Sequence, residues 1–188
     1  MSEPLTATPS KFSYYDSLSK QDRAIYDRSD AVHAIRLPYA MDCHGPIHDL
    51  MSGLRDADRQ QVQAASRALS DSILEQLDQP RVRVHVRARR PADDYSELQG
   101  LYEPREGRRW AAITVWMRTA KRNRVVAFKS FLRTLLHELV HHLDYELLQL
   151  DETFHTQGFY KRESSLYHQI VRGSRAARPS LSLRSKKR

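Results

Sequence analysis

A short His-Glu-Leu-Val-His sequence at residues 137–141 carries the residue types best suited to chemistry in this chain. In an α-helix, side chains four residues apart share one face, with Cβ atoms about 5–6 Å apart, so His137 and His141 can reach one metal ion. Zinc binds imidazole nitrogen at about 2 Å, and a catalytic zinc site keeps one position for water. Glu138 lies one step round the helix, where its carboxylate can take a proton from that water and pass it to a leaving amine. The spacing predicts two metal ligands and a general base.

A catalytic zinc site needs a third protein ligand, and three downstream residues are candidates. His155 lies 14 residues after His141, where a loop can return its imidazole to the metal. Glu163 lies 22 residues after His141 on the apolar stripe of a later helix, where a carboxylate needs a metal or an arginine as its partner. Asp144 lies one turn beyond His141, where orienting an imidazole is the more natural role. We expect His155 to be the third ligand, with Glu163 as the alternative.

The elements that must position these residues follow from hydrophobic periodicity. Apolar residues recur at helical spacing over residues 128–143, and His137 and His141 fall on the opposite side of that helix. We expect Asn123 to cap it. Valines alternate with arginine or histidine over residues 81–89, which is typical of a strand with one buried face. In all, we expect helices at 19–28, 56–77, 125–149 and 157–171, strands at 81–89, 99–102 and 111–117, and a turn at 38–46.

The order of these elements predicts an α+β protein, with a small sheet packed on the long histidine-bearing helix. We expect residues 1–50 to be an N-terminal extension with a short helix. Residues 51–172 should form the main domain, which closes with a C-terminal helix. Gly173 should end that helix, and residues 173–188, rich in Ser, Arg and Lys, should form a basic disordered tail.

Several other side chains have predictable roles. Trp110 and Trp116 flank the strand at 111–117 and are expected in the core. If that strand is the sheet edge beside the long helix, its backbone could hold an extended peptide. His142 points toward the apolar side of the helix and should be structural. Four later residues could stabilise an oxyanion, with no spacing rule to choose among them: Tyr145, Tyr160, Tyr167 and His168.

Composition narrows the class of protein. The chain has 188 residues, 40% hydrophobic and 29% charged, which suits one globular domain and contains no apolar run long enough to span a membrane. Cys43 is the only cysteine, so an intramolecular disulfide and a cysteine metal cluster are both excluded. The first ten residues lack the basic start and apolar stretch of a secretory signal, so we expect a cytoplasmic protein with no membrane partner.

The net charge of +8 is unevenly distributed along the sequence. Residues 81–133 contain 14 Lys and Arg against 5 Asp and Glu, and residues 173–188 contain 6 against none. The histidine-bearing stretch, residues 134–172, contains 3 against 6. The basic stretches predict non-specific attraction of nucleic acid or of acidic partners, and otherwise a solvated basic surface.

Residues 137–141, followed by His155-Thr-Gln-Gly-Phe159, resemble the zincin metallopeptidases of the SprT-like type. Those proteins carry His-Glu-x-x-His on the active-site helix and a later His-Gly-x-x-Phe, whose histidine is the third ligand. The resemblance covers about residues 82–172. It implies a zincin-like fold, Zn²⁺ as cofactor, a peptide or protein substrate and, in some members, an association with DNA.

The leading functional prediction is therefore a zinc-dependent peptidase. The alternative is a nucleic-acid- or protein-binding module without enzyme activity, in which zinc is structural. A structural site closes its fourth position with a protein ligand, and the sequence has no cysteine near the motif to do so, which favours an open site. A further alternative is a regulatory protease kept latent by residues 1–50 covering its cleft.

Overall fold

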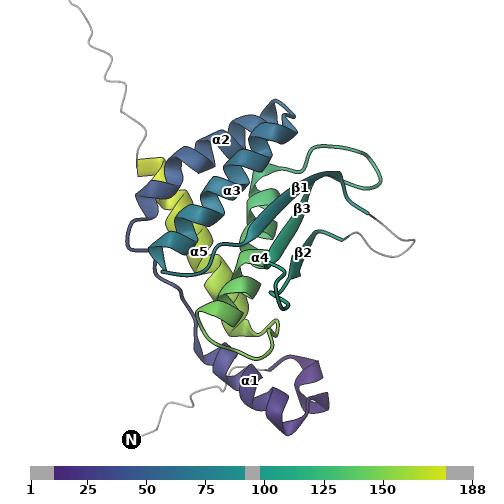
Figure 1. Cartoon of the computed structure of the whole chain (residues 1–188), viewed down its shortest axis with the longest axis vertical. Helices are drawn as coiled ribbons and strands as arrows, with labels where there is room; N and C mark the ends of the chain where they lie inside the picture. The colour runs from purple at the N-terminus through teal and green to yellow at the C-terminus, as the bar shows by residue number, and fades with distance from the viewer. Residues whose placement is uncertain (1–10, 92–97, 177–188) are drawn as a thin grey trace, which may run out of the picture.

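The chain has mixed α and β structure, as predicted, with a small sheet and most of its helices gathered round one core, while the first helix lies at one end of the molecule (Figure 1). The computed structural model describes residues 11–91 and 98–176, with the side chains of 173–176 left out (Figure 1). The described helices are α1 (Lys20–Ala31), α2 (His44–Arg55), α3 (Arg59–Gln76), α4 (Phe128–Glu146) and α5 (Gln157–Ala176), with short 3₁₀ turns at Ser13–Ser17 and Ala40–Cys43. The strands are β1 (Arg83–Arg89), β2 (Gly100–Glu103) and β3 (Ala112–Arg118).

The three strands form one sheet in the order β1-β3-β2, with β1 parallel and β2 antiparallel to β3. Val84 pairs with Ile113, and Val86 with Val115, and all four side chains are buried on the inner face. The alternation read from the sequence thus sets the register, because a shift by one residue would turn the valines outward. β3 is the central strand, so the condition under which its backbone could hold a peptide is not met, and β1 and β2 are the edges of the described sheet.

Helix α3 is stabilised by a capping residue at its N-terminus and by an apolar face that is buried in the core. The side chain of Asp58 accepts hydrogen bonds from the backbone N–H groups of Gln60 and Gln61, which caps the helix. Val62 and Leu69 on the inward face are fully buried. The side of the helix that carries Gln63 lies against β1, where the side-chain amide bonds the backbone of Val84 and Val86.

Helix α2 corrects two predictions. Residues 38–46, expected to be a turn, contain a short 3₁₀ turn and the first residues of this helix. Pro46 sits in its first turn, where the missing N–H costs nothing. The predicted domain boundary at residue 50 falls within α2, and Ile47 and Leu50 are buried in the same core as the sheet. Part of the N-terminal extension therefore belongs to the main domain.

Three local predictions also fail. Asn123 does not cap α4, because it lies in a turn with φ +49° and the helix begins five residues later at Phe128. An extended stretch intervenes, in which Val125 bridges to Arg118 of β3. Gly173 does not end α5, which continues to Ala176. Trp116 is buried as expected, whereas Trp110 is 55% exposed.

In the described part of the chain, no helix is both long enough and apolar enough to cross a membrane. The predicted disordered tail lies largely outside the described residues, since residues 177–188 are not among them.

Candidate metal centre

Three histidine side chains converge on one point, although they come from two parts of the chain. His137 and His141 lie one turn apart on α4, and His155 lies in the loop between α4 and α5. Nε2 of His155 is 3.0 Å from Nε2 of His137 and 3.1 Å from Nε2 of His141. One ring nitrogen from each histidine falls within 4.8 Å of the other two. We refer to these three residues as the histidine cluster.

Hydrogen bonds behind two of the rings determine which nitrogen faces the cluster. His137 Nδ1 lies 3.3 Å from a carboxylate oxygen of Glu163, which can only accept, so Nδ1 carries the proton. His141 Nδ1 lies 2.8 Å from the hydroxyl of Thr153, which donates to Asp144 at 3.0 Å. The threonine oxygen is therefore the acceptor for His141 Nδ1–H. Both rings present an unprotonated Nε2 to the cluster.

This arrangement of donors fits a metal cation. Lone pairs of neutral imidazoles repel one another when they meet, and a cation between them turns that repulsion into coordination. Nitrogen ligands about 2 Å from a tetrahedral zinc ion lie about 3.3 Å apart. The separations of 3.0 and 3.1 Å within the cluster are close to that value. Imidazole suits several transition metals, zinc among them, so the residues present fit the predicted cofactor.

Desolvation lowers the pKa of two of the imidazoles, those of the buried His141 and the more exposed His155. Burial, reinforced by the nearby His137 and His155, lowers the pKa of His141 to about 3. Burial also lowers the pKa of His155. A metal binds the unprotonated imidazole, so these rings are available as ligands at neutral pH without first losing a proton.

Glu138 lies next to the cluster, between α4 and β2. Its side chain is buried, and burial raises the pKa of its carboxyl group to about 7. A Cβ atom at Gly100 of β2 would overlap with Oε1 of Glu138, so this close approach requires glycine. Glu138, Gly100 and His137 line a cleft of about 350 Å³. A carboxylate that titrates near neutral pH beside a cleft can accept a proton and return it.

The loop that carries His155 is held from behind by the N-terminal residues. The hydroxyl of Tyr14 donates to the backbone oxygen of His155 at 3.0 Å. Asp30, near the end of α1, accepts a hydrogen bond from the N–H of Gly158 at 2.8 Å. A Cβ atom at Gly158 would lie 2.6 Å from backbone oxygens of Ser29 and Asp30. Gly158 therefore permits the close packing of α1 on α5, which fixes the position of the loop.

A buried ion pair connects this packing to the cluster. Arg162 of α5 donates to both carboxylate oxygens of Asp144 at 2.8 and 3.0 Å, and both side chains are 0% exposed. The same guanidinium donates to the backbone oxygens of Ser29 and Val32, at the end of α1, at 2.6 and 2.7 Å. Since Asp144 also accepts from Thr153, a continuous set of polar contacts runs from α1 to the ring of His141.

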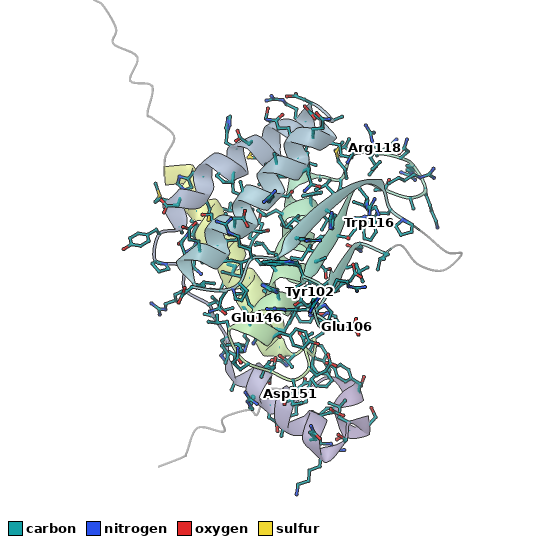
Figure 2. The ribbon with its side chains drawn as sticks, viewed as in Figure 1. Tyr102, Glu106, Trp116, Arg118, Glu146 and Asp151 are labelled. Carbon is teal, nitrogen blue, oxygen red and sulfur yellow. The ribbon has the colours of Figure 1, made fainter. Side chains whose placement is uncertain are left out.

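Aromatic rings enclose the cluster. The ring of Phe159 lies 4.7–5.0 Å from all three histidine rings. Tyr102 of β2 stacks on His141 at 6.2 Å, and Tyr160 stacks on His155 at 5.9 Å. These rings restrict how the imidazoles can turn, which helps to hold the ligand geometry. Figure 2 shows Tyr102 near Glu146, the last residue of α4.

The structure brings the three predicted ligands together, with the predicted base Glu138 beside them. Glu163, the alternative ligand, is not part of the cluster; it lines the cleft with Glu138 and pairs with Arg133 at 2.9 Å as well as with His137. Asp144 contacts the ring of His141 only through the hydroxyl of Thr153. The role expected of Asp144, which was to orient that imidazole, is therefore indirect.

Sequence reasoning missed several members of the site. Thr153 gives no periodic signal, because it lies in an irregular loop. Gly100 gives a weak one, since a lone glycine in a strand often marks a close approach. Tyr145, one of the four oxyanion candidates, donates to Glu152 instead. His142 is structural, as predicted, and contacts the backbone oxygen of Pro80 at 2.8 Å.

Comparison of the chain with protein-family models, with curated proteins and with solved structures finds no match. The functional conclusion therefore depends on the geometry of the site and on the motif itself.

Proposed function

We propose that this chain is a zinc-dependent metallopeptidase with a zincin-like domain. The observation that carries the proposal is the convergence of three imidazole nitrogens next to a cleft lined by Glu138. Three protein ligands with a remaining position for water are typical of catalytic zinc sites. Cys43, the only cysteine of the chain, lies buried beside Ser72 of α3, so no thiolate is available to close the site. The resemblance to SprT-like zincins belongs to the same proposal.

The roles of the residues follow from their positions. His137, His141 and His155 would hold zinc, which lowers the pKa of a water molecule and polarises a carbonyl group. Glu138 would accept the proton of that water and later deliver it to the leaving amine. Burial, which raises the pKa of this carboxyl group, favours proton uptake by it and so supports both steps. Glu163, by accepting from His137 Nδ1, would keep that ring in the tautomer that a metal requires.

The substrate is proposed to be an extended peptide bound along β2. Among the described strands β2 pairs only with β3, so its other edge offers backbone groups for strand addition. Gln99 and Gly100, at the start of β2, line the cleft with Glu138. A peptide paired with this edge would place one of its carbonyl groups beside the general base.

Two alternatives are less well supported. A binding module with a structural zinc would not need a buried carboxylate that titrates near neutral pH beside a cleft. A latent protease would need residues 1–50 over the cleft. The residues found to line it fall between Gln99 and Glu163, while residues 14–32 pack against the loop and helix behind the cluster.

The test uses the purified full chain and a fluorescent casein substrate. Hydrolysis should be abolished by a chelator and restored by zinc. Glu138→Gln should keep about one zinc per chain and lose at least about 100-fold in kcat/KM, because the base is absent while the ligands remain. Glu146→Gln, the same change two turns further along α4, is the matched control and should retain activity. Loss of zinc from Glu138→Gln would make Glu138 a ligand, and absence of hydrolysis by the zinc-loaded wild type would favour a structural zinc.

A further inference from the structure

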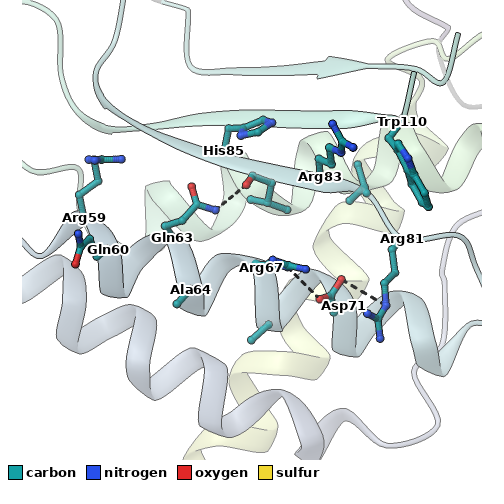
Figure 3. Close-up of a pocket in the computed structure, with 13 residues that line it drawn as sticks. Arg59, Gln60, Gln63, Ala64, Arg67, Asp71, Arg81, Arg83, His85 and Trp110 are labelled. Carbon is teal, nitrogen blue, oxygen red and sulfur yellow. Dashed lines mark hydrogen bonds and ion pairs between the residues drawn. The ribbon is translucent and has the colours of Figure 1, made fainter. Parts of the chain in front are cut away.

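A second concave site lies at the opposite edge of the sheet from the histidine cluster. It is a groove of about 1100 Å³ between α3 and β1 (Figure 3). The peptidase proposal gives this groove no role, because the cluster and its cleft involve β2, α4 and α5. Figure 3 shows Arg59 toward one end of the groove and Trp110 toward the other. We call it the basic groove.

The basic groove is strongly cationic. Four arginines line it, together with His85 and a single carboxylate, that of Asp71: Arg59, Arg67, Arg81 and Arg83. Asp71 lies 3.7 Å from Arg67 and 4.0 Å from Arg81, whose side chains are 69% and 65% exposed. One carboxylate cannot neutralise four guanidinium groups, so the groove keeps a net positive charge. Guanidinium groups that remain in contact with water match phosphate oxygens, which they can bind through two parallel hydrogen bonds.

Backbone groups on the outer edge of β1 already have hydrogen-bond partners, so they are not available to pair with a peptide. The side-chain amide of Gln63 donates to the backbone oxygen of Val84 at 2.6 Å and accepts from the N–H of Val86 at 2.7 Å. These are the two bonds that one residue of a neighbouring parallel strand would make. Arg59 adds a third contact, to the backbone oxygen of Val86 at 3.2 Å. Because α3 occupies these groups, strand addition is blocked here, and recognition falls to the charged side chains.

Trp110 adds a flat apolar surface to the charges. Its side chain is 55% exposed, which is unusual for the largest aromatic residue and contradicts the core position expected from the sequence. An exposed indole beside arginines can stack on an unpaired nucleobase while the arginines bind the phosphates on either side. A duplex keeps its bases stacked on one another and leaves none free for this ring.

We propose that the basic groove binds single-stranded nucleic acid, with the arginines on the backbone and Trp110 on a base. Binding of this kind is largely independent of sequence and falls with salt, because each neutralised phosphate releases a counterion. Four phosphate contacts predict a slope of about −3 in a plot of log affinity against log salt concentration. The site is independent of the metal centre, so failure of either proposal leaves the other intact.

The test is fluorescence anisotropy of the full chain with a labelled oligothymidine of about 15 nucleotides, at several salt concentrations. The double variant Arg59→Glu/Arg67→Glu should weaken binding at least about 10-fold and reduce the salt slope. Trp110→Ala should weaken it at least about 5-fold with little change in slope, since stacking releases no counterions. Asp71→Asn should strengthen binding, because it removes the only carboxylate among the described residues that line the groove.

The control is Arg36→Glu, a single charge reversal of the same kind at an exposed arginine that is not among the residues lining the groove. It should change affinity less than about 2-fold. Circular dichroism and thermal melting verify that each variant is folded. Asp71→Asn tests the groove through a gain in affinity, which a loss of folding could not produce. Equal losses from Arg36→Glu and the double variant would overturn the proposal. So would weaker binding by Asp71→Asn, or competition by polyglutamate as effective as that by unlabelled oligothymidine, which would assign the groove to acidic peptides.

Discussion

The histidine cluster and the basic groove lie at opposite edges of one sheet and are built in opposite ways. Behind the cluster, a buried ion pair joins Arg162 to Asp144, and both side chains are 0% exposed. Along the groove, arginines such as Arg67 and Arg81 stay more than half exposed and share one carboxylate. The first arrangement can hold an ion in fixed geometry, whereas the second can follow a flexible anionic ligand.

This difference predicts where the protein is sensitive to substitution. A buried polar group that loses its partner cannot turn to water, so changes around the cluster should be costly both for folding and for metal affinity. Exposed charges lose little when a neighbour is removed, so changes in the groove should alter binding but not folding. Four substitutions, each paired with a comparison variant, test this contrast.

Removing a ligand should have the largest effect. His155→Ala should weaken zinc binding by more than about 100-fold, because groups that only support a ligand are themselves worth about 10–100-fold. Glu163→Gln, which keeps the shape of the side chain behind His137, should cost less. Competition titration with a zinc-binding dye gives both affinities. The reverse ranking would make Glu163 the third ligand and would place the metal on the other side of His137.

Breaking the buried ion pair should be the next largest effect. Arg162→Met leaves the carboxylate of Asp144 buried without its cation, which should lower the free energy of unfolding by about 3–5 kcal/mol. Asp71→Asn, which breaks a partly exposed pair in the basic groove, should change it by less than about 1 kcal/mol. Urea unfolding of both variants makes the comparison. Similar losses from the two would remove the contrast between the regions.

Crowding the general base should abolish hydrolysis without removing the metal. The methyl group of Gly100→Ala would occupy the place of the Glu138 carboxylate, so we expect kcat/KM to fall by about 100-fold. Zinc stoichiometry should stay at one per chain, since the atoms nearest to the added methyl group belong to Glu138 and not to a proposed ligand. The control is Gly45→Ala in α2, where a Cβ atom meets open space and activity should be unchanged.

The smallest of these effects tests the contact chain behind His141. Thr153→Val keeps the side-chain shape but removes the hydroxyl between His141 and Asp144, so zinc affinity should fall by about 10–100-fold. Thr134→Val, on the cleft side of α4, removes a hydroxyl that bonds only its own helix at Ser130 and should leave zinc affinity unchanged. Equal affinities for Thr153→Val and the wild type would show that His141 needs no such support.

The two regions also differ in how far the sequence predicted them. The metal motif was readable because helical geometry alone brings His137 and His141 together, and the valines at 84 and 86 identified their strand by alternation. Thr153 was not readable because it lies in an irregular loop, which has no periodicity. The contact between Asp30 and the N–H of Gly158 was not readable because it joins residues 128 positions apart.

The basic groove was also only partly predictable from the sequence. The sequence revealed an excess of arginine over residues 81–133, but not that Arg59 and Arg67 of α3 would join Arg81 and Arg83 on one surface. Trp110 was expected in the core because large aromatic residues are usually buried, and the turn that precedes β3 leaves it exposed instead.

We propose that three histidines hold one zinc ion, and X-ray absorption at the zinc edge counts the ligands of that ion. For the wild-type chain loaded with one equivalent of zinc, we predict three imidazole nitrogens and one further light atom at about 2.0–2.1 Å, with no sulfur. His155→Ala should reduce the imidazole count to two, and Glu163→Gln should leave it at three. A wild-type spectrum with only two imidazoles, or one unchanged in His155→Ala, would contradict the account.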